Sequence, residues 1–353
     1  MLAVSQLLSP PLPWPLRRRF AAGVDLGVSE ARLVVLSRGG ERAGPVRVEW
    51  LGEMALECSA MAGGEIADRA AVARAVAALF SQWPRYRAVG RRLSCAMAVP
   101  GSATIIDSLP LSHPFPHPSS RLGEALHQST IDAMEAAVYA HAERLAGIER
   151  RAIAVDWFVD EGNCGCAAPV SASPRAAAAP HVTIAATARH YLEARIEVAA
   201  SAGIALRAVD GELPAALRAL CHVAEHELRE AVPFAAIWFG GDGMYGWRVT
   251  DESVQASVRY PAPEHPDLEA ALCTLAAGQA LGCAVVGGDL GRLTGCGVSL
   301  ADISRLLGCA VRPFECTPFL ESDTHASLAS ACHWACAPSF AVAFGLALRG
   351  VRE

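Results

Sequence analysis

The sequence contains no lysine, and all thirty basic residues are arginine. This absence excludes a P-loop lysine, a Schiff-base lysine and a serine–lysine dyad. The chain also has no run of 18 or more apolar residues, so no segment is expected to span a membrane. The formal net charge is −6 and the longest basic run is 17–19, which argues against a nucleic-acid-binding protein.

The twelve cysteines form no repeated CxxC pattern. Two close pairs, Cys164 with Cys166 and Cys332 with Cys336, are weak evidence for zinc and are more typical of buried or incidental thiols. Residues 1–15 are apolar and proline-rich, and arginines follow them, which is the reverse of a secretory signal. We therefore expect residues 1–20 to be a disordered tail and the protein to be cytoplasmic, with reduced cysteines.

A strand, a glycine turn and a second strand are predicted over 23–36. Asp25 lies near the end of the first strand, Gly27 allows the turn, and Ser29 follows it. Backbone N–H groups in such a turn can cradle a phosphate, and the acid can hold Mg²⁺ directly or through water. The alternative interpretation is an ordinary β-hairpin with a solvent-exposed aspartate.

The same pattern returns twice later in the chain. One turn carries Gly240, Gly241 and Asp242 after an apolar strand, and another carries Gly287 and Gly288. Two halves that open in the same way predict a duplicated fold with a cleft between the halves. Two of the turns could bind a polyphosphate from opposite sides of the cleft, and the third could lie under the base of a nucleotide.

The remaining segments predict a mixed α/β protein. Asp68 is a candidate N-cap for a helix, and a long helix is expected over 122–146. A β-α-β unit over 182–209 is expected to turn Tyr191, Leu192, Ile196 and Ala199 inward. Further helices are expected over 214–232 and 337–349. Segments 109–120, with its histidines, and 161–180 are predicted to be loops.

Several short segments in a fixed order resemble the type IV pilus assembly protein PilM family, whose fold is actin- and FtsA-like. They are 23–36, 64–68, 96–102, 182–188, 209–212 and 338–350. The resemblance implies an α/β, actin-like (ribonuclease H-like) fold with two lobes, duplicated mixed sheets and a central cleft, the second lobe being reduced. The expected divisions are 21–212 for the first lobe with an inserted subdomain at about 95–180, 213–336 for the second, and 337–353 for a helix that returns to the first.

The resemblance also implies a function. Proteins of this family are cytoplasmic, bind ATP and Mg²⁺ in the cleft, and dock the cytoplasmic N-terminal tail of the membrane protein PilN. They thereby link the inner-membrane platform to the pilus motor in twitching motility or competence. A groove near 95–180 would take the tail. The implied site residues are Asp25, Gly27 and Ser29 on the first phosphate loop, with Asp25 toward the metal, Gly240 and Gly241 on the second, Gly287 and Gly288 on the adenosine loop, and the acidic pair Asp210 and Glu212.

The chain departs from the family at several of these positions. The acid that opens the second loop is replaced by Trp238, and Asp242 is the nearest substitute. A helical segment that carries a nucleotide-covering lysine is missing after Tyr260. Each lost charge-assisted contact is worth about 1.5–3 kcal/mol, so two or three losses move a micromolar site toward the millimolar range. We therefore expect a degenerate ATP site with very slow or absent hydrolysis.

Two alternatives remain open at this point. One is an active phosphotransferase of the same fold, such as a sugar kinase or an exopolyphosphatase. It would need a catalytic acid at the second loop, where Trp238 lies. The other is a relative of the cytoplasmic part of the type II secretion protein GspL.

Overall fold

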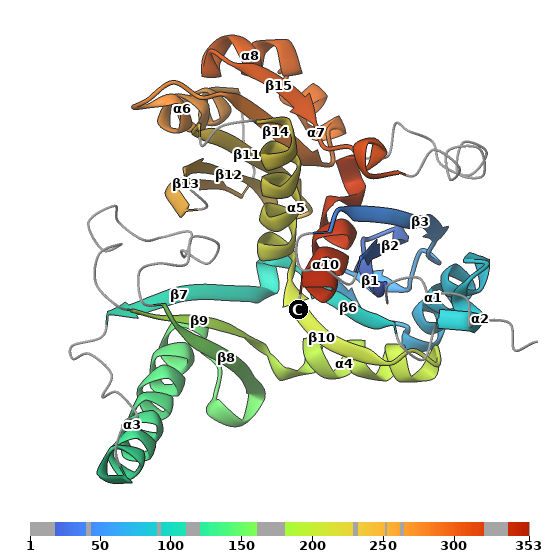
Figure 1. Cartoon of the computed structure of the whole chain (residues 1–353), viewed down its shortest axis with the longest axis vertical. Helices are drawn as coiled ribbons and strands as arrows, with labels where there is room; N and C mark the ends of the chain where they lie inside the picture. The colour runs from blue at the N-terminus through green and yellow to red at the C-terminus, as the bar shows by residue number, and fades with distance from the viewer. Residues whose placement is uncertain are drawn as a thin grey trace, which may run out of the picture.

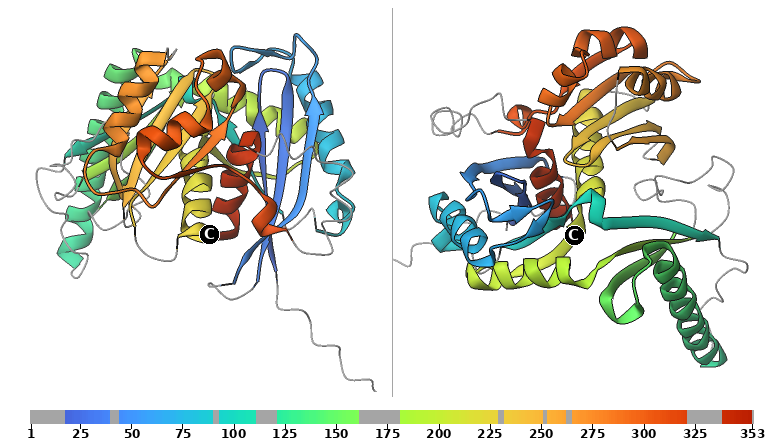
Figure 2. Two further views of the ribbon diagram at one scale, coloured as in Figure 1. Left: turned by 90° about the horizontal axis from the view of Figure 1, so that it is seen from above. Right: turned by 180° about the vertical axis from the view of Figure 1, so that it is seen from behind.

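The computed structural model describes residues 18–39, 44–89, 93–110, 121–160, 181–228, 232–250, 253–261, 265–320 and 338–352. Two five-stranded sheets form two lobes, and a separate three-stranded sheet with one long helix projects from the first lobe (Figures 1 and 2). The actin-like two-lobed arrangement expected from the sequence is thus confirmed.

The first-lobe sheet has the order β10-β6-β1-β2-β3. Strand β1 pairs antiparallel with β2 and parallel with β6, so the predicted hairpin lies at the centre of the sheet. The strands are β1 (Arg19–Leu26), β2 (Glu30–Arg38), β3 (Val46–Ala55), β6 (Ser94–Val99) and β10 (Leu206–Gly211). Because β1 begins at Arg19, the expected tail of residues 1–20 is two residues too long, and 1–17 lie outside the described residues.

Helices α1 (Arg69–Gln82) and α4 (Arg189–Ser201) pack against one another in the apolar core of this lobe. The Asp68 side chain accepts a hydrogen bond from the Ala71 N–H at 2.9 Å, which confirms the predicted N-cap. Smaller elements nearby are β4 (Met61–Ala62), β5 (Glu65–Ile66), α2 (Tyr86–Val89) and the 3-10 turn η2 (Gly101–Ala103).

The inward face of α4 differs from the expected one. Its buried residues are Ala194, Arg195, Val198 and Ala199, whereas Ile196 is 50 % exposed. The prediction placed Ile196 inward because its spacing matches an apolar stripe. The helix is instead rotated so that the Arg195 side chain enters the protein, where backbone carbonyls accept its hydrogen bonds.

The projecting arm contains the sheet β7-β9-β8 covered on one face by α3. Its elements are β7 (Thr104–Pro110), α3 (Arg121–Ala146), η3 (Arg150–Ala152), β8 (Ile153–Asp160) and β9 (His181–Ala188). Strand β6 belongs to the first-lobe sheet, so the arm spans 104–188 rather than the expected 95–180. Residues 111–120, with His113 and His117, and 161–180, with Cys164 and Cys166, lie outside the described residues.

The second-lobe sheet has the order β13-β12-β11-β14-β15. Every residue of β11 and β14 is buried, in keeping with strands covered on both faces. The strands are β11 (Phe234–Gly240), β12 (Gly243–Thr250), β13 (Ser253–Tyr260), β14 (Cys283–Gly288) and β15 (Ala310–Pro313). The helices are α6 (His265–Ala276), α7 (Gly291–Gly295), α8 (Leu300–Leu307) and the 3-10 turn η5 (Thr317–Phe319).

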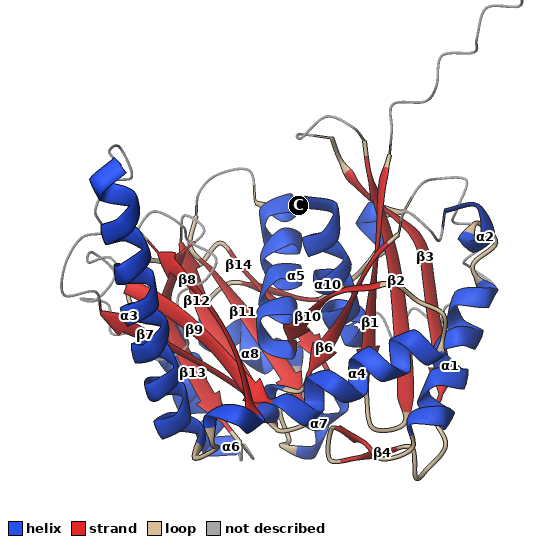
Figure 3. Ribbon diagram, turned by 90° about the horizontal axis from the view of Figure 1, so that it is seen from below, coloured by secondary structure: helices blue, strands red, loops and turns tan. Residues whose placement is uncertain are grey.

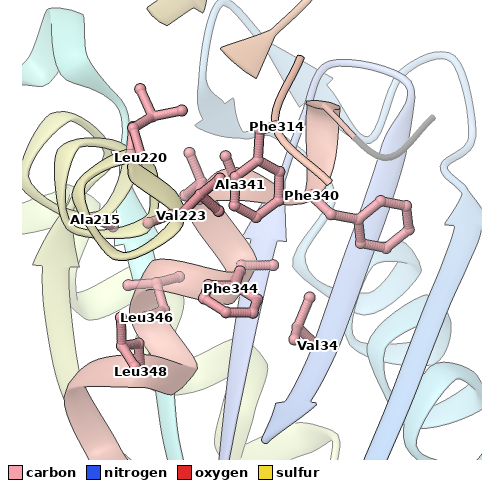
Figure 4. Packing of buried hydrophobic residues seen from close by; sticks show 14 of the residues in the cluster. Val34, Ala215, Leu220, Val223, Phe314, Phe340, Ala341, Phe344, Leu346 and Leu348 are labelled. Carbon is pink, nitrogen blue, oxygen red and sulfur yellow. The ribbon is translucent and has the colours of Figure 1, made fainter. Parts of the chain in front are cut away.

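Two helices, α5 (Glu212–Glu227) and α10 (Ala341–Arg352), lie side by side between the two large sheets (Figure 3). Their side chains form the largest apolar cluster, which includes Leu220, Val223, Phe344 and Leu346 (Figure 4). Helix α10 packs against β1, β2 and β6 of the first-lobe sheet. Residues 321–337, with Cys332 and Cys336, lie outside the described residues.

Two glycines allow this close packing. A Cβ atom on Gly345 would overlap the Ala215 backbone of α5, with the carbonyl carbon at 2.6 Å. A Cβ atom on Gly23 of β1 would lie 2.7 Å from the Ala347 nitrogen of α10. Within the described part of the chain, no helix is long and apolar enough to cross a membrane.

Candidate functional site

A cavity of about 640 Å³ lies between the lobes where three glycine turns meet. The turns follow β1, β11 and β14, which are the three positions predicted from the sequence. Of the ten predicted site residues, eight line this cavity: Asp25, Gly27, Ser29, Glu212, Gly240, Gly241, Asp242 and Gly288. Asp210 and Gly287 do not.

The first turn is closed by its own backbone. The Gly27 N–H donates to the Glu30 carbonyl at 2.8 Å, and the Ser29 carbonyl accepts from the Leu56 N–H at 2.7 Å. Val28 at the tip is 65 % exposed. Behind the turn, burial raises the pKa of Asp25, and the charges of Arg32 and Arg195 oppose that rise.

The second turn is a tight hairpin in which Gly240 pairs with Gly243. A Cβ atom on Gly240 would lie 2.9 Å from Glu212 Oε1 and 3.2 Å from Asp242 Oδ1, so only glycine leaves both carboxylates in place. Asp242 Oδ2 accepts a hydrogen bond from the Tyr245 hydroxyl at 2.5 Å. Its Oδ1 is buried and has no hydrogen-bond partner among the described residues.

The third turn requires a left-handed backbone at Gly288, where φ is +93°. The Asp289 N–H donates to the Phe239 carbonyl at 2.9 Å and ties this turn to β11. Arg292 connects this turn to the second one within the same lobe, since its Nη2 donates to the Gly241 carbonyl at 2.9 Å. Gly287 instead faces the core, where its Cβ would meet Leu220 at 3.1 Å.

Glu212 is a carboxylate of the cavity with hydrogen-bond donors on both of its oxygens. Its Oε2 accepts the Gly101 N–H at 2.8 Å, and its Oε1 accepts the Trp238 indole N–H at 3.1 Å. Burial and the charge of Asp25 raise the pKa of Glu212 to about 7, against the effect of its two donors. Trp238 is therefore a buried residue of the cleft wall that also holds a carboxylate, a role its sequence position does not reveal.

The predicted acidic pair is divided by the structure. Asp210 is the penultimate residue of β10 and turns away from Glu212, forming ion pairs with Arg218 at 3.1 Å and Arg349 at 3.5 Å. The division follows from the junction itself, because the strand ends at Gly211 and α5 begins at Glu212. The two acids therefore serve different regions of the protein.

Three arginines that line the cavity were not identified from the sequence: Arg32, Arg195 and Arg292. Arg195 is buried, with 1 % of its surface exposed, and it donates to the Ala98 and Tyr191 carbonyls. The spacing along the sequence could have identified Arg195. It lies three residues before Val198 and four before Ala199, which places all three on the inward face of α4.

Two observations describe the space that a ligand would enter. The position of a Cβ on Gly241 has nothing within 4 Å, so the cavity is open beside the second turn. Among the described residues, however, no group of three or more acidic, histidine or cysteine side chains is arranged to hold a metal. Asp25, the predicted metal-binding residue, has the Arg32 guanidinium 3.8 Å from its Oδ2.

A second cavity of about 340 Å³, here called the groove, lies between the first lobe and the arm. Its walls come from β8, β9, α4 and β10, and include Thr187, Leu192, Ile196 and Arg207. Strand β10 is the last strand of its sheet, so its outer edge has no strand partner within the described ranges. The Thr187 hydroxyl is buried without a described hydrogen-bond partner. The half-exposed Ile196 thus belongs to a groove with a free strand edge.

No family model and no curated protein matches the chain. Among solved structures, a type IV pilus biogenesis complex of PilM and PilN matches with a TM-score of 0.65 and 18 % identity over 94 % of this chain and 98 % of that chain. Ethanolamine utilization protein EutJ from Carboxydothermus hydrogenoformans matches with a TM-score of 0.39 and 15 % identity over 96 % and 91 % of the two chains. The cytoplasmic domain of EpsL, from the type II secretion system of Vibrio cholerae, matches with a TM-score of 0.36 and 13 % identity. The match covers 76 % of this chain and 81 % of that chain. Over 94 % of its length, the chain thus shares its fold with the matched chain of the PilM–PilN complex, and that fold is the actin-like one expected from the sequence.

Proposed function

We propose that this protein is a cytoplasmic actin-like scaffold of a type IV pilus assembly platform. It is peripheral to the inner membrane and docks the cytoplasmic N-terminal tail of a PilN-like membrane protein, through which it contacts other platform and motor proteins. The observation that carries the proposal is the match to the PilM–PilN complex over nearly the whole length of both chains.

The groove is the candidate docking site for the tail. Leu192 and Ile196 offer an apolar floor on α4, and β10 offers the backbone groups of a free edge. An extended peptide that adds to such an edge gains main-chain hydrogen bonds, and its alternate side chains enter the pockets below. The tail is therefore expected to lie along β10 with apolar residues over Ile196.

Peptide binding tests this proposal. A fluorescent peptide with the sequence of the N-terminal tail of the PilN-like protein from the same genome is titrated with the full chain, and anisotropy is measured. Ile196→Asp is expected to weaken binding about tenfold or more, which corresponds to about 1.4 kcal/mol. Leu145→Asp is the matched control, because Leu145 is similarly exposed on α3 outside the groove. Absence of binding by the unaltered chain, or equal losses in both variants, would contradict the proposal.

The cleft between the lobes is proposed to bind ATP weakly and to hydrolyse it slowly or not at all. Asp25, Gly27, Ser29, Gly240, Gly241 and Gly288 are the candidate phosphate-side residues. Trp238, where the family has an acid, neither activates water nor ligates a cation. Calorimetry with ATP and with a nucleotide-free control measures the affinity, which is expected to lie between micromolar and millimolar.

One observation favours the phosphotransferase alternative. Glu212 is a buried cleft carboxylate whose pKa is about 7, which is the range of an effective general base. Phosphate release from ATP decides between the two functions. Turnover in the range of kinases, about 1–100 s⁻¹, with loss in Glu212→Gln, would favour the phosphotransferase; turnover far below that range is expected for the scaffold.

A further inference from the structure

Asp25 and Arg32 lie directly opposite one another on the central hairpin of the first lobe. The Arg32 Nη1 atom is 3.8 Å from Asp25 Oδ2, and both side chains are largely buried, at 17 % and 15 % exposure. On its other side Arg32 faces Glu53 of β3, and its Nε atom is 3.0 Å from Glu53 Oε2. Glu30 is a further partner of the same guanidinium. The arginine is thus fixed against Asp25 by the register of three strands.

A second guanidinium, that of Arg195 on α4, lines the same cavity as Asp25. Arg195 is held by the Ala98 carbonyl of β6 and by the Tyr191 carbonyl of its own helix at 3.0 Å. The charge of Arg195 acts on Asp25 together with that of Arg32. Burial lowers the pKa of Arg195 to about 10, so its guanidinium stays protonated near neutral pH.

Three of the four carboxylate oxygens of Glu212 and Asp242 are also engaged by hydrogen-bond donors. Glu212 is held by Gly101 and Trp238, and Asp242 Oδ2 by the Tyr245 hydroxyl, with Arg259 at 3.8 Å. Mg²⁺ requires near-octahedral oxygen ligands at about 2.0–2.1 Å and loses its water reluctantly. A dication beside Asp25 would have to displace or tolerate two fixed guanidinium groups.

We propose that the cleft takes a nucleoside polyphosphate without a divalent cation, because Arg32 and Arg195 provide at Asp25 the positive charge that the cation would supply. The inference rests on the proposed binding of ATP in this cleft. Arg292 lies on the opposite side, where its guanidinium contacts the Gly241 carbonyl at the edge of the second turn. The phosphate chain is then flanked by arginines from both lobes.

Calorimetric titration of the full chain with ATP, in excess Mg²⁺ and in excess EDTA, tests the inference. The two dissociation constants are expected to agree within about threefold. Weakening by about tenfold or more in EDTA, or no binding in either buffer, would overturn it. Arg292→Gln is expected to weaken binding equally in both buffers, and Arg305→Gln, which removes an exposed arginine of α8 outside the cleft, is expected to leave it unchanged.

A cation probe tests the role of Arg32 without ATP turnover. Mn²⁺ titration followed by electron paramagnetic resonance is expected to detect no Asp25-dependent site in the unaltered chain. Arg32→Gln keeps a polar partner for Glu53 but removes the positive charge, and it is expected to create a Mn²⁺ site. Adding Asp25→Asn to that variant is expected to abolish the new site. A site in the unaltered chain that Asp25→Asn removes would overturn the inference, even if Arg32→Gln fails to fold.

Failure of the cation inference can be distinguished from failure of the proposed docking function. A chain that binds the PilN-like tail but requires Mg²⁺ for ATP contradicts the cation inference alone. A chain that binds ATP equally well in EDTA but does not bind the tail contradicts docking alone.

Discussion

The Trp238 indole Nε1 donates a hydrogen bond to Glu212 Oε1 at 3.1 Å, which connects the second-lobe sheet to the first residue of α5. The other oxygen of the same carboxylate accepts the Gly101 N–H of the first lobe at 2.8 Å. One side chain therefore links groups from both lobes at the floor of the cleft. Trp238 has a structural role here, because its hydrogen bond stabilises the ionised form of a buried glutamate.

Trp238→Phe is expected to raise the pKa of Glu212 further above 7. The substitution removes a donor to the carboxylate, and a hydrogen bond to a charged group is worth about 1.5–3 kcal/mol, or about one pH unit or more. A carbon-13 NMR titration of glutamate-labelled protein measures the change, with Glu212→Gln to assign the signal. Trp50→Phe is the matched control, since the Trp50 indole N–H has no hydrogen-bond partner among the described residues. An unchanged midpoint in Trp238→Phe would contradict the prediction.

Glu212→Gln is expected to make stability less dependent on pH. The pKa of Glu212 rises from 4.5 to about 7 on folding, so its favourable contribution is complete below about pH 4.5 and is lost as the pH rises through about 7. The loss is on the order of 3 kcal/mol, and a neutral glutamine does not incur it. The variant should therefore be more stable than the unaltered chain at pH 8 but not at pH 4.

Urea denaturation at both pH values measures this difference. Glu197→Gln serves as the control, because Glu197 is an exposed glutamate on α4 that pairs with Arg69. The same change in unfolding free energy at pH 4 and pH 8 for Glu212→Gln would refute the assignment of the pH dependence to this residue.

The position of the cleft could be predicted from the sequence because its three turns are local features. Glycine at a strand end marks a turn, and strands that start in similar patterns converge in a duplicated fold. The turns at Gly27, Gly241 and Gly288 therefore line one cavity. Gly287 differs from its neighbour because successive residues of β14 point to opposite sides of the sheet, and its position facing Leu220 depends on where α5 packs.

The electrostatics of the site could not be predicted in the same way. The interaction between Asp25 and Arg32 depends on the exact register of β1 and β2, and Arg195 enters the cleft because of the rotation of α4. The assignment of Asp210 and Glu212 to different sites depends on a helix that starts between them. These relationships join distant segments, so spacing along the chain does not reveal them.

Gly345→Ala is expected to destabilise the whole protein. The added methyl group would overlap the Ala215 backbone, and backbone atoms of α5 cannot move away as a flexible side chain can. Overpacking of a core costs about 1–3 kcal/mol, and the larger value is expected here because α5 and α10 join the two lobes. Thermal unfolding measures the loss. Gly295→Ala is the control, since nothing lies within 4 Å of its Cβ position, and its melting temperature should not fall.

Asp210→Asn is expected to change stability but not ATP affinity, whereas Asp25→Asn is expected to change ATP affinity. Asp210 is 12 % exposed and is shared by Arg218 and Arg349, so the loss of its charge should lower stability by about 1–3 kcal/mol. Arg218 also donates to the Gly345 carbonyl at 2.9 Å, which ties this ion pair to the α5–α10 contact rather than to the cleft. Asp25→Asn instead changes a cavity residue and should alter the affinity for ATP.

Both quantities are measured on both variants, by urea denaturation and by calorimetry with ATP in EDTA. The expected result is an unchanged ATP affinity for Asp210→Asn despite its lower stability. Because a carboxylate near bound phosphates is repulsive without a cation, Asp25→Asn should bind ATP more tightly than the unaltered chain. Equal losses of affinity in the two variants would mean that the two acids act together in the cleft, contrary to their separate arginine partners.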